Sequence, residues 1–108
     1  MAEVSIDAAS MAVTVKAGIG GHVWLSFHEI SGEANLTYRL DAFTARSIAA
    51  TIEYRGESAV EEMRCFAKNP DESVSLRLGK TSVWMGIEEA DDLAESIHKA
   101  LSWKEAHP

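Results

Sequence analysis

Aromatic and basic side chains alternate with apolar residues in several short segments of this chain. Successive side chains of a β-strand point to opposite faces, so this spacing gathers the aromatic and basic residues onto one side of a sheet. Indole and phenyl rings can stack on flat groups, and Lys and Arg can neutralise an anion. The nine residues that we expect on this shared face are Lys16, Trp24, His28, Arg39, Arg64, Phe66, Lys68, Arg77 and Trp84. These residue types predict a binding surface.

Two kinds of partner fit such a surface. Trp, Phe and Arg are enriched at protein interfaces, and the same side chains stack bases and follow phosphates in proteins that bind single-stranded nucleic acid. The chain carries 17 acidic and 10 basic side chains and a net charge of -7, which disfavours nucleic acid, although the local field at a patch matters more than the sum. We expect a protein partner or a homodimer. Single-stranded nucleic acid and a merely solvated set of side chains are the alternatives.

A second candidate surface is acidic. A predicted helix near the C-terminus opens with Glu88, Glu89, Asp91 and Asp92, and Glu95 later in the same helix completes the patch. Concentrated negative charge can imitate nucleic acid and block the basic groove of another protein. Acidic residues in a first helical turn also complement the helix dipole, so helix stability alone is the competing interpretation.

The sequence offers no arrangement typical of catalysis or metal binding. No two of the histidines, at 22, 28, 98 and 107, have the i, i+4 spacing of a zinc-binding helix. The single cysteine, Cys65, is expected to face the core and to behave as a small apolar residue. We therefore expect no catalytic residue, no metal and no cofactor, and predict that the protein is not an enzyme.

Two features bear on location. A lone cysteine fits a reducing cytoplasm, and no apolar run approaches the ~18–20 residues that a membrane-spanning helix needs. We expect a cytoplasmic protein without membrane contact.

Two helices are predicted from apolar residues that recur at offsets of three, four and seven. The segments 40–52 and 85–97 match each other at a separation of 45 residues. Asp41 is placed to cap the first helix. The stripes that face the core are Ala45, Ile48, Ala49 and Ile52 in the first helix, and Ala90, Leu93, Ala94 and Ile97 in the second.

Strands are predicted before each helix from alternation with a period of two. Their ranges are 12–17, 22–30, 35–40, 63–68, 74–78 and 82–87, with turns at 18–21, 31–32, 69–72 and 79–80. The segment 63–68 has an alternative, because Ser58 and Glu61 have the spacing of a capping box and could start a short helix.

These elements predict one α+β domain over residues 1–108. We expect two βββα repeats, at about 11–57 and 60–104, that form one antiparallel sheet of about six strands with both helices on one face. The predicted inward residues are Val13, Val15, Val23, Leu25, Phe27, Leu36, Tyr38, Leu40, Met63, Cys65, Val74, Leu76, Leu78, Val83, Met85 and Ile87. The other face stays uncovered, which favours a small non-enzymatic binding module, of an accessory, regulatory or phage-type inhibitory kind, that self-associates or meets another protein there.

Overall fold

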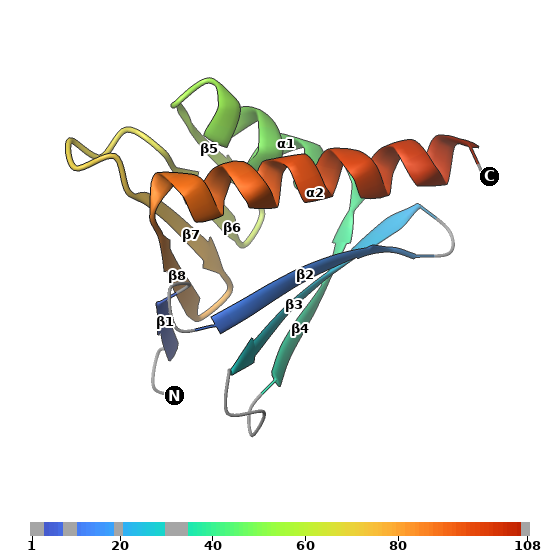
Figure 1. Cartoon of the computed structure of the whole chain (residues 1–108), viewed down its shortest axis with the longest axis horizontal. Helices are drawn as coiled ribbons and strands as arrows, with labels where there is room; N and C mark the ends of the chain where they lie inside the picture. Colours follow the sequence, from blue (N-terminus) through green and yellow to red (C-terminus); the bar gives the residue numbers. More distant parts are fainter. Residues whose placement is uncertain (1–3, 8–10, 19–20, 30–34, 107–108) are drawn as a thin grey trace.

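The computed structural model describes residues 4–7, 11–18, 21–29 and 35–106. The predicted α+β class is confirmed (Figure 1). In chain order the elements are β1 (Val4–Asp7), β2 (Met11–Ala17), β3 (His22–Glu29), β4 (Asn35–Asp41), α1 (Ala42–Glu53), β5 (Glu57–Val60), β6 (Met63–Phe66), β7 (Val74–Leu78), β8 (Thr81–Met85) and α2 (Ile87–Ala106).

The strands form two separate sheets, where the sequence predicted one. One sheet has the antiparallel order β2-β3-β4, and the other has the order β1-β8-β7-β6-β5, in which β1 pairs with β8 in parallel and the remaining pairs are antiparallel. Alternation determines which face a side chain takes but not which strands pair. Since β4 continues directly into α1, the chain leaves the first sheet before it forms β5, β6, β7 and β8 of the second.

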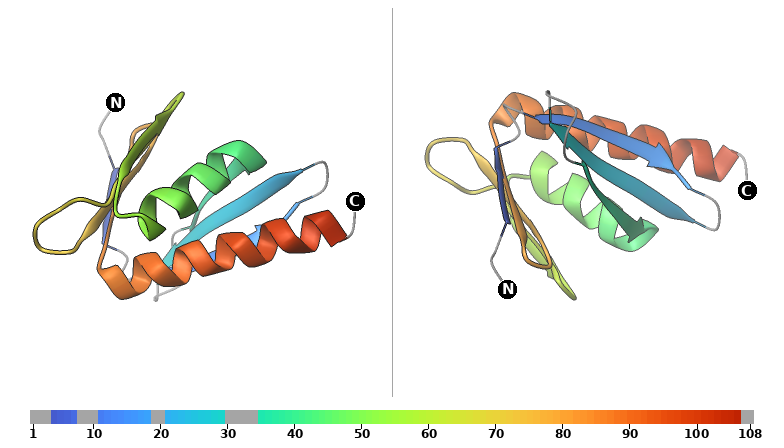
Figure 2. Two further views of the ribbon diagram at one scale, coloured as in Figure 1. Left: turned by 90° about the horizontal axis from the view of Figure 1, so that it is seen from above. Right: turned by 90° about the horizontal axis from the view of Figure 1, so that it is seen from below.

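Both helices lie on the inner side of both sheets and pack against each other (Figure 2). The helix α1 contacts β3 and β4 of the first sheet and β5 and β6 of the second, while α2 contacts β2, β3 and β8. The two sheets therefore share one hydrophobic core. A side-chain hydrogen bond between the hydroxyls of Tyr38 in β4 and Thr81 in β8 also joins them.

The predicted cap of the first helix is confirmed. The Asp41 carboxylate accepts a hydrogen bond from the backbone N–H of Thr44, with 2.7 Å between Oδ1 and N, which satisfies a donor that the helix itself leaves open. This hydrogen bond holds the pKa of the Asp41 carboxyl below its usual value. The helix ends at Glu53. The N–H of the C-cap residue Tyr54 donates to the Ala50 carbonyl, and Arg55 follows with a left-handed φ of 52°.

The predicted core is confirmed as well. All eight residues of the two helical stripes are buried, as are Val23, Leu25, Phe27, Leu40, Met63, Cys65, Val74, Leu76, Leu78, Val83 and Met85. The other predicted inward residues are partly buried and pack against this cluster: Val13, Val15, Leu36, Tyr38 and Ile87. Burial raises the pKa of the Cys65 thiol to about 12.

Several smaller predictions have mixed outcomes. Residues 63–66 form a strand and not a helix, but Lys68 lies beyond its end, and the strands β1 and β5 were not predicted. The turns at 69–72 and 79–80 are present. The turn at 31–32 and the middle of the turn at 18–21 lie outside the described residues.

Three antiparallel strands followed by a helix occur twice, yet the two units do not share a sheet, so the internal repeat stays a prediction.

Candidate functional site

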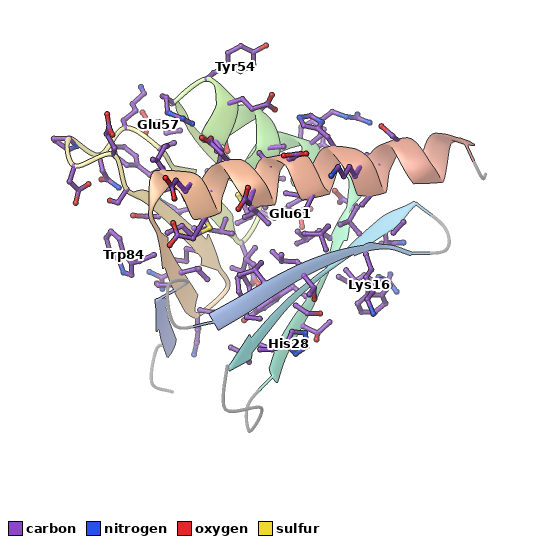
Figure 3. All side chains as sticks on the ribbon, in the orientation of Figure 1. Lys16, His28, Tyr54, Glu57, Glu61 and Trp84 are labelled. Carbon is purple, nitrogen blue, oxygen red and sulfur yellow. The ribbon has the colours of Figure 1, made fainter. Side chains whose placement is uncertain are left out.

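The nine residues predicted for one face are divided between the two sheets. Because the helices cover only the inner sides, each sheet keeps an open outer face, and the two faces point in different directions (Figures 2 and 3). We call the outer side of β2-β3-β4 the first outer face, with Lys16, Trp24, His28 and Arg39. We call the outer side of β6-β7-β8 the second outer face, with Arg64, Phe66, Arg77 and Trp84. Lys68 lies in the loop after β6.

A hollow lies between two aromatic rings on the second outer face. Phe66 is opposite Ser75 on the neighbouring strand, and Ser75 is opposite Trp84. The small serine between the two large side chains leaves an open space of about 530 Å³, which Ser82 and both arginines also line. Phe66 is 37% exposed and Trp84 is 51% exposed, so both rings are available to a partner.

The next row of this face brings two arginines together. Arg64 on β6 is directly opposite Arg77 on β7, a placement of like charges that destabilises an antiparallel pair. The Nε of Arg77 donates to the Gly79 carbonyl at 3.0 Å, while Arg64 forms no ion pair with any residue that the structure describes. A negatively charged group beside Arg64 would offset this repulsion.

Acidic side chains border the same face. Glu57 lines the hollow and forms an ion pair with Lys68, with 3.6 Å between Oε1 and Nζ. An adjoining space of about 570 Å³ is lined by both arginines and also by Glu61 and Glu62. The second outer face therefore has charges of both signs around an apolar centre.

The loop between β6 and β7 fixes the floor of the hollow. Asn69 donates from Nδ2 to Ser75 Oγ at 3.3 Å and to the Ser73 carbonyl at 3.1 Å. Asp71 accepts from the Ser73 hydroxyl at 2.7 Å, and this hydrogen bond lowers the pKa of the Asp71 carboxyl. The sequence predicted a turn here but gave no indication that it supports a site, because Asn and Ser are ordinary turn residues.

The first outer face has a different arrangement. Lys16, Trp24 and Arg39 are opposite one another on three adjacent strands, so the indole lies between two cations. The next row holds only hydroxyls, those of Thr14, Ser26 and Thr37. The Ser26 and Thr37 hydroxyls are 3.2 Å apart, and Thr14 Oγ1 is 3.3 Å from Nε2 of His28.

Glycine holds the indole of this face in place. A Cβ atom on Gly18 would lie 2.7 Å from Nε1 of Trp24, so the ring lies directly against the Gly18 backbone. Trp24 is nevertheless 41% exposed. Among the described side chains at outward positions of β2, β3 and β4, the only carboxylate is that of Asp41, which caps α1.

The predicted acidic patch is partly paired within the chain. Asp91 forms an ion pair with Arg55 and Glu95 forms one with Lys99, each with 3.2 Å between the charged atoms. The other members belong to the first turns of α2, and Glu88 and Asp92 are exposed. The pairing lowers the charge that this surface would offer to a basic groove.

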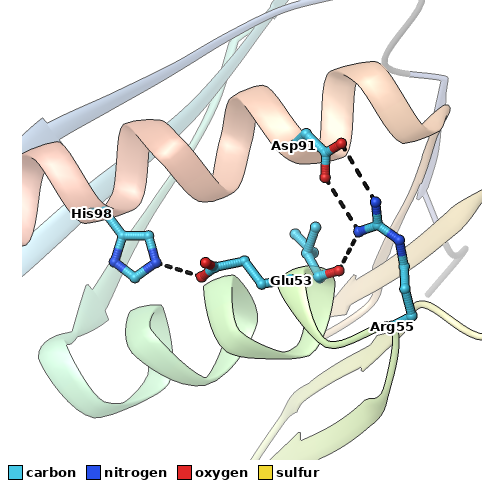
Figure 4. A network of polar contacts seen from close by, with 5 residues as sticks. Glu53, Arg55, Asp91 and His98 are labelled. Atoms are coloured by element: carbon cyan, nitrogen blue, oxygen red, sulfur yellow. Dashed lines mark hydrogen bonds and ion pairs between the residues drawn. The ribbon is translucent and has the colours of Figure 1, made fainter.

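Two of the polar contacts at this surface tie the helices together (Figure 4). Arg55, just after α1, holds Asp91 of α2 and also donates to the Ile52 carbonyl. Nε2 of His98 on α2 is 2.5 Å from Oε1 of Glu53 on α1. These contacts therefore link the two helices that support both sheets.

The described part of the chain holds no group of three or more His, Cys, Asp or Glu side chains placed to bind a metal ion. None of the helices over the described residues is long and apolar enough to cross a membrane.

Comparison with known proteins gives no relative from which a role could be transferred: no family model, no curated protein and no solved structure matches the chain.

Proposed function

We propose that this protein is a non-enzymatic binding module that acts through protein–protein contact, and that its contact surface is the second outer face. The observation that carries this proposal is the hollow between Phe66 and Trp84 beside the opposed pair Arg64 and Arg77. Exposed Trp and Arg side chains around a pocket are the residues that dominate binding energy at protein interfaces.

The occupant that fits this surface is a second copy of the chain. A two-fold interface joins the same patch of both subunits, so the patch must be complementary to itself. The second outer face meets this condition, since the exposed Trp84 adjoins a hollow that can receive an indole. Glu61 and Glu62 likewise lie beside arginines that attract carboxylates.

Charge favours a protein over nucleic acid at this face. A strand of nucleic acid needs a continuous series of cations along its phosphates. On the second outer face, Lys68 is already paired with Glu57, and two further glutamates border the arginines. The carboxylates would repel a polyanion, whereas they can pair with arginines of a second copy.

The test is the mass of the protein in solution, measured by size-exclusion chromatography with light scattering over a wide concentration range. We expect a concentration-dependent dimer. Trp84→Ala should weaken it by about tenfold or more, as expected for a central interface residue worth at least ~1.4 kcal/mol.

The matched control is Trp24→Ala, which removes a partly exposed indole from the other sheet and should leave the dimer intact. A monomer at every concentration, or equal loss in both variants, would overturn the proposal.

A further inference from the structure

We infer that the first outer face binds a nucleotide unit, a flat base with its phosphate, of the kind found in single-stranded nucleic acid. This surface lies on a different sheet from the proposed protein contact, so the inference does not depend on that function. Three features carry it: a fixed aromatic platform, cations on both sides of that platform and a row of hydroxyls.

The platform is the Trp24 indole. The ring lies against the backbone of Gly18, where even a methyl group would collide with it. The Gly18 N–H also donates to the His22 carbonyl at 2.8 Å, which ties the glycine to the strand that carries the ring. A base can stack on a ring held in this way without ordering it first, and stacking accepts any base because every base has a π-face.

The cations flank the ring. Neighbouring strands are ~4.8 Å apart, so the backbones of Lys16 and Arg39 lie about 5 Å to either side of the strand that carries Trp24. The phosphates on both sides of a stacked base would come within reach of these long side chains. Neither cation forms an ion pair with a described residue, so no described side chain neutralises either charge.

The hydroxyl row extends the same site. Thr14, Ser26 and Thr37 lie next to the cationic row, and Ser and Thr side chains commonly contact phosphate and sugar oxygens. His28 adds an imidazole within hydrogen-bond distance of Thr14. The one described carboxylate at the outward positions is engaged in capping α1. The described charged side chains of this face are cationic, apart from the capping carboxylate, and hydroxyls lie beside them, which favours an anionic ligand and distinguishes this face from the second outer face.

The strength of binding is limited by charge. If Lys16 and Arg39 each neutralise one phosphate, the slope of log K against log salt should be about -1.4 for a single strand. The net charge of -7 opposes any polyanion at long range. We therefore expect weak, salt-sensitive binding that recognises about one nucleotide at its centre.

The experiment uses the whole chain and a fluorescently labelled oligothymidine in an anisotropy titration at low and moderate salt. Trp24→Ala should weaken binding by about 5- to 150-fold, the range found for one stacked base. The double change Lys16→Gln with Arg39→Gln should abolish the salt slope. The control variants are Tyr54→Ala and Lys80→Gln, which change an exposed aromatic ring and an exposed cation outside the first outer face. Both should bind the oligonucleotide as the unchanged protein does. Circular dichroism confirms that each variant is folded.

Two competitors identify the source of the ligand. Thymidine monophosphate that displaces the oligonucleotide at a similar concentration per nucleotide supports the site and points to free nucleotides, whereas poor displacement points to a strand. Polyglutamate that competes equally well would show attraction of any polyanion and would overturn the inference. Absence of binding at low salt, or binding unchanged by both the Trp24 and the Lys16 and Arg39 variants, would also overturn it.

Discussion

The two outer faces are built from the same residue types on the same kind of strand, yet they differ in what they can bind. On the first outer face, the indole of Trp24 separates Lys16 from Arg39. On the second, two rings flank a serine, and two arginines are directly opposite each other. The first is a single platform between cations, and the second is a hollow with charges of both signs.

Register explains this difference. Because side chains at opposite positions of adjacent strands are the ones that interact, a shift in pairing changes which group is next to which. A list of exposed Trp, Arg and Lys residues is the same for both arrangements. Composition therefore predicts that a surface binds something, whereas the neighbours across the strands determine which ligand fits.

We expect the largest loss of stability from substitutions in the two helices, because both sheets pack on them. Ile48 in α1 and Ile97 in α2 are fully buried between the sheets, so Ile48→Ala or Ile97→Ala should lower the free energy of unfolding by about 2–5 kcal/mol. Both sheets should unfold in one transition, because both pack on the same helices.

Urea titration checks this prediction with variants that keep only Trp24 or only Trp84 as the fluorescent reporter. The two reporters should give the same midpoint in each background. Separate midpoints would show that the two sheets unfold independently, as two small domains would.

Much of this fold could be predicted from local pattern. The helical stripes, the inward strand residues and the Asp41 cap are short-range features, since each depends on spacing within one element. The sheet arrangement could not be predicted in this way. The parallel pairing of β1 with β8 joins residues that are far apart in the sequence. The strand β5 has only partly buried or exposed side chains, so its apolar signal is weak.

The candidate site, like the sheet arrangement, could be predicted only in part from the sequence. Trp24 and Trp84 are both exposed on strands, as alternation indicates, but they were expected on one shared face. Since the strands divide between two sheets, the nine predicted residues form two smaller surfaces. The hollow over Ser75 was not predicted, because it arises from the order of large and small side chains across three strands.

A smaller effect concerns the helix that links the two sheets. Asp41→Ala removes the cap of α1, which starts at the end of β4 and reaches β5, and should cost about 1 kcal/mol. Asp41→Asn can still accept the hydrogen bond and should retain most of the stability. Urea titration at neutral pH measures both variants, and an equal loss in the two would show that the charge rather than the hydrogen bond stabilises the helix.

The same contact predicts a pH dependence. The pKa of Asp41 is lowered in the folded state, so its contribution is complete above the usual pKa of an aspartate. It is lost as the pH falls through the lowered value, because the protonated carboxyl is a poorer acceptor. The difference in stability between the unchanged protein and Asp41→Ala should therefore shrink in acid.

The smallest expected change in stability comes from replacing Arg64 on the second outer face. This replacement should stabilise the monomer but weaken the dimer. Arg64→Thr removes one of two like charges at directly opposite positions and places a β-branched residue in a strand. The isolated monomer should become more stable by about 0.2–1 kcal/mol, and the gain should shrink at high salt as the repulsion is screened. Arg39→Thr is the matched change on the first outer face, where the opposite residue is an indole, and it should give no such gain.

Dimer formation should weaken in Arg64→Thr and not in Arg39→Thr. A loss of monomer stability in Arg64→Thr would mean that the two arginines do not repel each other. The second outer face would then have no reason to attract a carboxylate.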